Sequence, residues 1–455
     1  MTSSSEIWNR FVEFTEEEMD RLKIPGVAIG VLHNEFLSTK GLGVTSIKNP
    51  LPVHEETLFQ IGSITKTFTC SAIMSLIENE KLSLDTKIIN ILPDFKLKDD
   101  EVTSNCNIQH LLTHSGGWVG DFFIDTGSGD DALDLYMNRM TDLDQVASLG
   151  SYYSYNNSGF SLLGLILERI HEKSYEEAIS ETILAPLDMD SCHFKPTDVM
   201  VGRFCVGHRI EEEELIIAKP WHLTRCAYPA GGLVASVGDL LKYSQFHLNM
   251  DSSKSESILT NESRLLMQKP HYSVQKDKED CGLSWRIQKI DKNRVISHGG
   301  ATNGQIALLL LVPKYKFALV VLANADLGRQ LIKEVQKWCL KEYLNIDTPP
   351  VKTVEATPEE MKELEGRYTL PKVGYTDIAV LGDTLVAQDT YTGGFPTEDT
   401  PPPPAPPPYR LAFTGVDNLV VLDGEGKDFE SQIIRDDEGK FSFLRMAGRL
   451  HVLSN

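Results

Sequence analysis

The sequence lacks any long hydrophobic run. Its most apolar stretch, residues 306–312, has only strand length, whereas a membrane-spanning helix needs about 20 apolar residues. Positive charge is also scarce, because 44 Lys and Arg stand against 65 Asp and Glu, which gives a net charge of −21. Such acidity argues against nucleic acids and anionic membranes as partners. We therefore expect a protein that binds neither of them.

Cysteine is sparse as well, with seven residues that show no paired spacing. An odd number of scattered cysteines is typical of reduced, buried thiols in a cytoplasmic protein rather than of a disulfide framework. The first ten residues lack the basic stretch and apolar run of a signal peptide. His208, His222 and His247 do not have metal-ligand spacing. We expect a cytoplasmic protein that uses no metal or other cofactor.

The length of 455 residues exceeds what one hydrophobic core usually supports, so we expect two domains. The pattern of predicted elements changes after a proline-containing segment near residue 349, beyond which only short strands and turns are expected. We predict a first domain over residues 1–346, a linker over 347–356 and a second domain over 357–455. Short strands separated by glycine-containing turns predict a small all-β barrel in the second domain. The strands are expected at 376–380, 384–388, 409–413, 418–421, 430–435 and 440–446.

Residues 59–67 set a hydroxyl and an amine one helical turn apart at the start of a predicted helix. Apolar residues recur at helical spacing over 67–77, and residues three apart share a helix face, so Ser63 and Lys66 can meet. A serine needs a neighbouring base to act as a nucleophile, and a lysine buried at the positive end of a helix can supply one. Gly62 permits a sharp turn just before the serine. Taken alone, this pattern also fits a helix cap beside an exposed lysine.

Two later stretches complete a set of three motifs. The loop at 153–157 reads Tyr-Ser-Tyr-Asn-Asn, and residues 298–300 read His-Gly-Gly on a predicted strand. The order S-x-x-K, Y-x-N and [K/H]-x-G resembles the serine β-lactamase and penicillin-binding-protein superfamily. The branch that it resembles holds class C β-lactamases, D-aminopeptidases and family VIII esterases. The residues that carry the match are Ser63, Lys66, Tyr155, Asn157, His298 and Gly300.

The resemblance covers about residues 10–345 and implies an α+β fold. This fold is a β-lactamase/transpeptidase-like domain, with an antiparallel sheet flanked by helices and an all-α subdomain. The predicted barrel behind it resembles the lipocalin-like domain that some members of the superfamily carry. It has no chemical motif of its own. We expect it to cover the mouth of the active site or to mediate self-association, and to be dispensable for acylation by a small ester.

The resemblance also implies catalytic roles. Ser63 would form a covalent ester with the substrate's acyl group. Lys66 and Tyr155 would act as a coupled acid–base pair, and the sequence leaves open which of them takes the first proton. The oxyanion hole would use the backbone N–H groups of Ser63 and Ala301.

Three further residues would bind the substrate. Asn157 would donate an amide hydrogen bond to the acyl-side carbonyl, and Gly300 would leave room for a substrate lying along the strand. His298 departs from the β-lactamase pattern, which has lysine here to hold the drug's carboxylate. Because histidine is largely neutral at physiological pH, it holds an anionic group less firmly, and it resembles the D-aminopeptidase members.

We therefore predict a serine hydrolase that acts on amide or ester bonds of small, D-residue-containing peptides. The alternatives are a β-lactamase, a small-ester carboxylesterase, and an acyltransferase or macrocyclising thioesterase. A catalytically inactive binding or scaffold protein is an alternative of another class. The only protein partner that we expect is a second copy of the chain, bound through the C-terminal domain.

Overall fold

A large antiparallel sheet forms the centre of the first two thirds of the chain. The structure is a computed structural model that describes residues 4–436 and 438–454. Two strands of the sheet, residues 293–302 and 305–312, are joined by a hairpin turn at residues 303–304, where Gly304 has a φ of +73°. Its eight strands follow the order β2 (Phe36–Gly43), β1 (Gly26–His33), β12 (Phe317–Ala323), β11 (Gln305–Val312), β10 (Asn293–Thr302), β9 (Arg286–Ile290), β8 (Glu279–Cys281) and β7 (Tyr272–Gln275).

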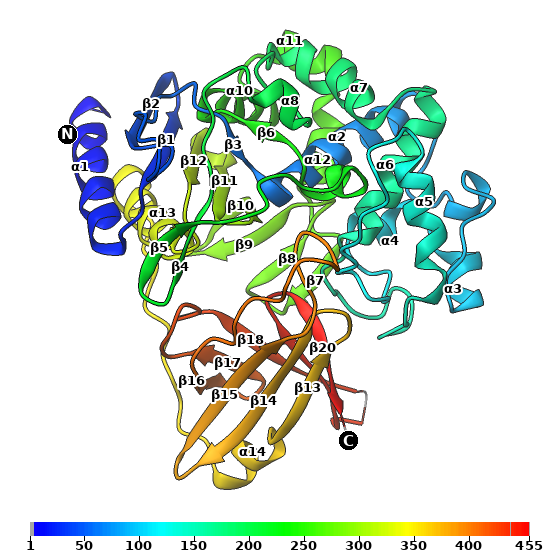
Figure 1. Cartoon of the computed structure of the whole chain (residues 1–455), viewed down its shortest axis with the longest axis vertical. Helices are drawn as coiled ribbons and strands as arrows, with labels where there is room; N and C mark the ends of the chain where they lie inside the picture. Colours follow the sequence, from blue (N-terminus) through cyan, green and yellow to red (C-terminus); the bar gives the residue numbers. More distant parts are fainter. Residues whose placement is uncertain (1–3, 437, 455) are drawn as a thin grey trace.

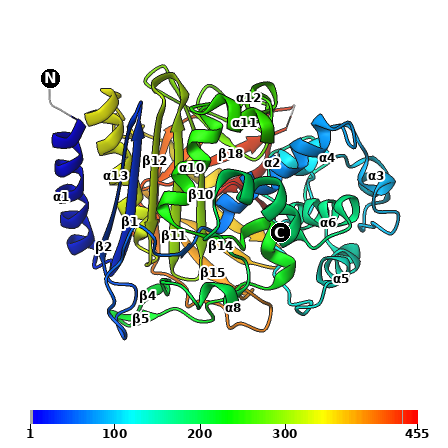
Figure 2. The same cartoon turned by 90° about the horizontal axis from the view of Figure 1, so that it is seen from above.

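Helices cover both faces of this sheet. Alternate residues of a strand point to opposite faces, so apolar residues of one strand contribute to two separate cores. In β1, Ile29 and Val31 face a core with α1 (Ser4–Leu22) and α13 (Gly328–Leu344). Ala28 and Leu32 face the core that contains α2 (Thr65–Glu78) and α10 (Val237–His247). Figure 2 shows α1 and α13 on one side of the sheet and the larger helical region on the other.

The helical region beyond α2 holds the rest of the first two thirds. Its helices are α3 (Asp100–Asn105), α4 (Ile108–Leu112), α5 (Ala132–Arg139), α6 (Ser158–His171), α7 (Tyr175–Ile179), α8 (Pro196–Val199), α9 (Tyr228–Gly231), α11 (Ser252–Ile258) and α12 (Asn261–Met267). Two small sheets join β3 (Phe59–Gln60) to β6 (Val234–Ala235) and β4 (His208–Glu211) to β5 (Glu214–Ile217). The predicted α+β class is therefore confirmed.

The C-terminal part is a closed barrel of eight antiparallel strands, as predicted, preceded by α14 (Pro358–Glu363). The last strand was not among those expected from the sequence. The strands are β13 (Gly366–Leu370), β14 (Gly374–Leu381), β15 (Thr384–Tyr391), β16 (Tyr409–Gly415), β17 (Asn418–Val421), β18 (Glu430–Arg435), β19 (Phe441–Met446) and β20 (Arg449–Ser454). The predicted boundaries at residues 346 and 357 stay predictions.

The barrel lies against the end of the large sheet that carries β7 and β8 (Figure 1). Lys278 pairs with Glu430 at 2.9 Å, and Gln275 Nε2 donates a hydrogen bond to Asn418 Oδ1 at 2.7 Å. Across residues 4–436 and 438–454, no helix is both long enough and apolar enough to span a membrane.

Candidate active site

Two glycines bring the serine turn against strand β10. Ser63 lies in the 3-10 turn Gly62–Ile64 that leads into α2. Gly62 has a φ of +52°, and a Cβ there would lie 2.6 Å from the Ala301 nitrogen. A Cβ on Gly300 would lie 1.8 Å from the Ile61 carbonyl oxygen. This close contact between backbones requires glycine at position 300. The expectation from the sequence was instead that Gly300 leaves room for a substrate along the strand.

Lys66 lies on the first turn of α2 and is fully buried. Its Nζ is 3.1 Å from Ser63 Oγ and donates a hydrogen bond to the Ala230 carbonyl oxygen at 2.6 Å. Burial, followed by the positive charge of Arg449, holds the pKa of Lys66 well below its usual value. An amine with a lowered pKa therefore lies beside the serine hydroxyl, at the position that the S-x-x-K spacing predicted.

Tyr155 reaches the same point from the loop that precedes α6. Its ring centroid lies 4.9 Å from Lys66 Nζ. Burial raises the pKa of the Tyr155 phenol, and a hydrogen bond with Ser63 and the nearby Arg449 charge offset part of that rise. The phenol is thus protonated in the resting site, and it lies beside the Ser63 hydroxyl and the Lys66 amine.

The structure adds two charged residues that the sequence analysis missed. Asp121 accepts a hydrogen bond from the Asn157 amide and pairs with Arg449 Nε at 3.0 Å. The guanidinium carbon of Arg449 lies 4.5 Å from the Tyr155 ring centroid. Arg449 comes from the barrel, so one catalytic motif is held by both parts of the chain. The glycine of the Ala-Gly pair at 447–448 could have indicated a turn here, and with it a further strand that carries this arginine.

His114 supports the same loop from the helical region. It lies in the stretch His110–Gly117, two residues after α4 ends. Its ring stacks on Tyr155 with centroids 4.4 Å apart, and its Nδ1 accepts a hydrogen bond from the Asn156 amide at 3.0 Å. Burial is the first cause that holds the pKa of His114 well below its ordinary value. This neutral histidine fixes the position of the tyrosine ring.

His298 lies on β10 and is buried at 4% exposure. Its ring centroid is 6.3 Å from that of Tyr155, and its Nδ1 is 2.7 Å from the Gly299 carbonyl oxygen. Burial lowers the pKa of His298 to about 3, so the ring is neutral at physiological pH. The seven predicted residues lie around the serine turn and the two elements that face it, β10 and the Tyr155 loop.

The sequence profile of the beta-lactamase family matches residues 11–334. The chain belongs to this family. Penicillin-binding protein 4 of Amycolatopsis lactamdurans is 26% identical over 372 residues, which cover 78% of this chain and 96% of that protein. The serine β-lactamase and penicillin-binding-protein resemblance is therefore confirmed.

Solved structures share the complete arrangement of this family member, barrel included. The octameric penicillin-binding protein homologue from Pyrococcus abyssi is 25% identical, with a TM-score of 0.66, and the match covers 98% of this chain and 99% of that one. SurE crystallised with D-Leu is 20% identical, with a TM-score of 0.71, and the match covers 99% and 100% of the two chains. The second likeness shows the fold alone.

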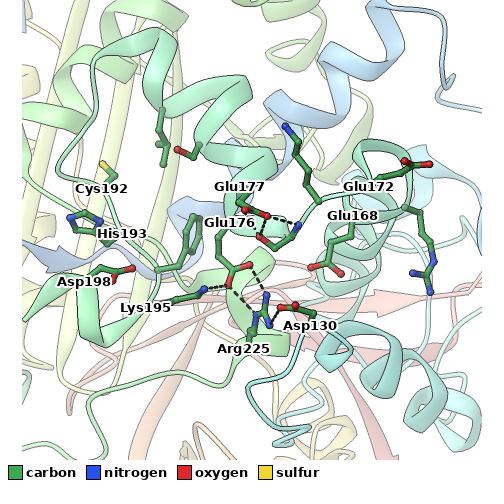
Figure 3. A pocket seen from close by; sticks show the side chains of 16 residues that line it. Asp130, Glu168, Glu172, Glu176, Glu177, Cys192, His193, Lys195, Asp198 and Arg225 are labelled. Carbon is green, nitrogen blue, oxygen red and sulfur yellow. Dashed lines mark hydrogen bonds and ion pairs between the residues drawn. The ribbon is translucent and has the colours of Figure 1, made fainter.

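A cavity of about 810 Å³ lies away from the serine turn of this beta-lactamase family member. Figure 3 shows it between α6, α7 and the segment at 192–198, with Arg225 paired to Glu176 and Asp130 at its base. None of the seven predicted site residues lines it. Its wall is rich in carboxylates, of which Asp130 and Glu176 pair with Arg225.

Proposed function

We propose that this protein is a serine hydrolase that works through a Ser63 acyl-enzyme on amide or ester bonds of small peptides. The observation that carries the proposal is the position of the buried Lys66 amine, 3.1 Å from Ser63 Oγ, where burial holds the pKa of Lys66 well below its usual value. An amine in this state can accept the proton of an attacking hydroxyl at neutral pH.

The reaction follows from these positions. Ser63 Oγ attacks the substrate's acyl carbonyl, and its proton passes to Lys66. Tyr155 then donates a proton to the leaving amine or alcohol as the old bond breaks, and it is reprotonated from Lys66. In the second step water attacks the ester and gives one proton to the Lys66–Tyr155 pair. The pair returns that proton to Ser63 Oγ as the ester C–O bond breaks, which releases the acid and restores the Ser63 hydroxyl. The backbone N–H groups of Ser63 and Ala301 stabilise the oxyanion in both steps, where one such donor is worth about 3 kcal/mol.

Lys66 is assigned as the first base because its pKa is lowered whereas that of Tyr155 is raised. A protonated phenol is a proton donor, so the two groups divide the work of the coupled pair. Asn157 binds the acyl-side carbonyl of the substrate once its amide turns from Asp121.

The substrate class follows from His298 and from one likeness. A neutral histidine replaces a permanent positive charge, so the site favours a substrate without a fixed anionic group at this point. SurE, which shares the fold, was crystallised with D-Leu. Both observations support small peptides with a D-residue as substrates.

Mass spectrometry of the intact protein tests this function. The full chain is incubated with D-residue peptides, penicillins and short-chain p-nitrophenyl esters, with Ser63→Ala as the control. We expect an adduct of one acyl group in the wild type and none in the variant. Hydrolysis of penicillins alone identifies a β-lactamase, and neither an adduct nor a product from any compound identifies an inactive binding protein.

Self-association also belongs to the proposal. The Pyrococcus abyssi homologue is described as octameric, which supports an assembly of this chain, and we propose the barrel as its contact surface. Light scattering after size exclusion gives the mass directly, and a monomer at all concentrations contradicts this part of the proposal.

A further inference from the structure

The turn between β19 and β20 of the barrel forms part of the wall around the second catalytic motif. The Tyr155 backbone N–H donates to the Gly448 carbonyl oxygen at 2.8 Å. One residue before, Ser154 Oγ accepts a hydrogen bond from the Leu450 backbone N–H at 3.2 Å. The loop that carries the catalytic phenol is thus hydrogen-bonded to the barrel on both sides of Arg449.

Arg449 adds a charge at this contact. Its side chain is 25% exposed and that of Asp121 is 6% exposed, so the ion pair is partly shielded from water and stronger than a surface pair. Arg449 Nη1 also donates to the Ala447 carbonyl oxygen at 2.8 Å. The guanidinium is therefore held in place over the Tyr155 ring by two partners.

We propose that Arg449 is a positioning residue of the catalytic centre, which holds Asp121 and the Tyr155 loop and places a fixed positive charge beside the acid–base pair. This inference rests on the proposed function and assigns a catalytic purpose to the barrel. The expectation that the barrel is dispensable for acylation does not fit these contacts, because its removal would take Arg449 away from Asp121 and the Gly448 carbonyl away from the Tyr155 N–H.

The direction of the electrostatic effect is fixed by sign. A positive charge favours the deprotonated form of a neighbouring group, and a negative charge opposes it. Arg449 therefore lowers the pKa of both Lys66 and Tyr155, whereas Asp121 raises both. Other titratable or charged groups also act on this cluster, directly or through Tyr153, and they are His114, Tyr153, Glu279, Cys281, Arg286 and His298.

The test compares two variants with opposite expected shifts. The rate of Ser63 acylation by a short-chain p-nitrophenyl ester is measured against pH in the full chain. We expect Arg449→Gln to move the midpoint of the rising limb up by about one pH unit, the low end of what a charge within roughly 4–6 Å produces. Asp121→Asn should move it down, and Arg449→Lys should restore most of the wild-type midpoint.

Lys278→Gln is the matched control. It breaks an ion pair between the sheet and the barrel, with Glu430 at 2.9 Å, but on residues that do not contact Tyr155. We expect no shift of its midpoint. A loss of rate in Arg449→Gln that is equal at every pH would assign a merely structural role to Arg449 and overturn the proposal. An unchanged profile would overturn it as well.

A second measurement does not depend on turnover. A thermal double-mutant cycle over Arg449→Gln and Asp121→Asn should show a coupling, whereas a cycle over Lys278→Gln and Glu430→Gln should show much less. If the wild type is never acylated, the proposed function fails, and the cycle still decides whether Arg449 holds Asp121. Absence of coupling there contradicts the positioning role on its own.

Discussion

The serine turn and the tyrosine loop meet in one site but are supported in different ways. The turn is fixed by its own region, where Gly62 and Gly300 allow β10 to touch the backbone at residues 61–63. The loop is fixed from outside, because Tyr155 donates its backbone N–H to Gly448 of the barrel. The position of the nucleophile Ser63 is thus fixed by a backbone contact with β10. The position of the proton donor Tyr155 also depends on the contact between its loop and the barrel.

This difference separates two kinds of variant. Changes in the serine turn should remove activity without affecting the barrel contact. Changes in the barrel turn should act on the protonation of Lys66 and Tyr155 before they act on the nucleophile. The following experiments test that separation, from the largest expected effect to the smallest.

Ser63→Ala should abolish acylation while leaving the thermal midpoint close to that of the wild type. The hydroxyl is the attacking group, and its hydrogen-bond partner Lys66 keeps the Ala230 carbonyl as an acceptor. Intact mass after incubation with an ester and a thermal melt give both quantities. Turnover near the wild-type rate would show that the nucleophile lies elsewhere.

Tyr155→Phe should lower kcat by roughly two to four orders of magnitude, which is the usual range for a positioned acid–base group. Tyr153→Phe is the matched control, because Tyr153 is also buried and lies two residues away in the same loop. We expect a mild effect for the control in steady-state kinetics. The opposite ranking would mean that the second motif is assigned to the wrong tyrosine.

Gly300→Ala should lower kcat/KM by about 10²-fold, the size of losing one oxyanion donor. The new Cβ would lie 1.8 Å from the Ile61 carbonyl oxygen, so strand and serine turn must separate. At the adjacent Gly299 the nearest atom to an added Cβ is the Ala307 carbonyl oxygen, at 3.7 Å. Gly299→Ala should therefore be nearly silent, and equal losses in both variants would argue against this contact.

Much of this organisation could be predicted because it rests on local patterns. The helix after Ser63 follows from apolar spacing, and the hairpin at 303–304 from an Asn-Gly pair. The three motifs then indicated residues that the fold brings together. No local pattern indicated β7, β8 and β9, which are short and carry polar residues.

Arg449 could not be predicted for a different reason. Its importance comes from the packing of the barrel against residues more than 300 positions earlier in the chain. Such a contact leaves no periodicity in the sequence, and the strand that holds Arg449 was itself missed. The stacking of His114 on Tyr155 likewise depends on the loop conformation, which no local pattern indicates.

The smallest expected effect concerns the cost of burying Lys66 in the serine turn. The pKa of Lys66 is well below its usual 10.5 in the folded protein, so between these two values the unfolded chain holds a proton that the folded protein lacks. Stability must then rise with pH through this window and must be reduced at pH 7. Lys66→Met removes this cost but loses the hydrogen bond to the Ala230 carbonyl, worth about 1 kcal/mol.

These two contributions differ in their dependence on pH, which separates them. The lost hydrogen bond is constant, whereas the protonation cost disappears as the pH approaches 10.5. We expect Lys66→Met to melt a few degrees above the wild type at pH 7 and to lose that advantage by pH 10, in melts across this range. Lys278→Met, at an exposed lysine, should show no such trend. A constant difference at all pH values would mean that Lys66 is protonated in the folded protein, and the first base would then have to be reassigned to Tyr155.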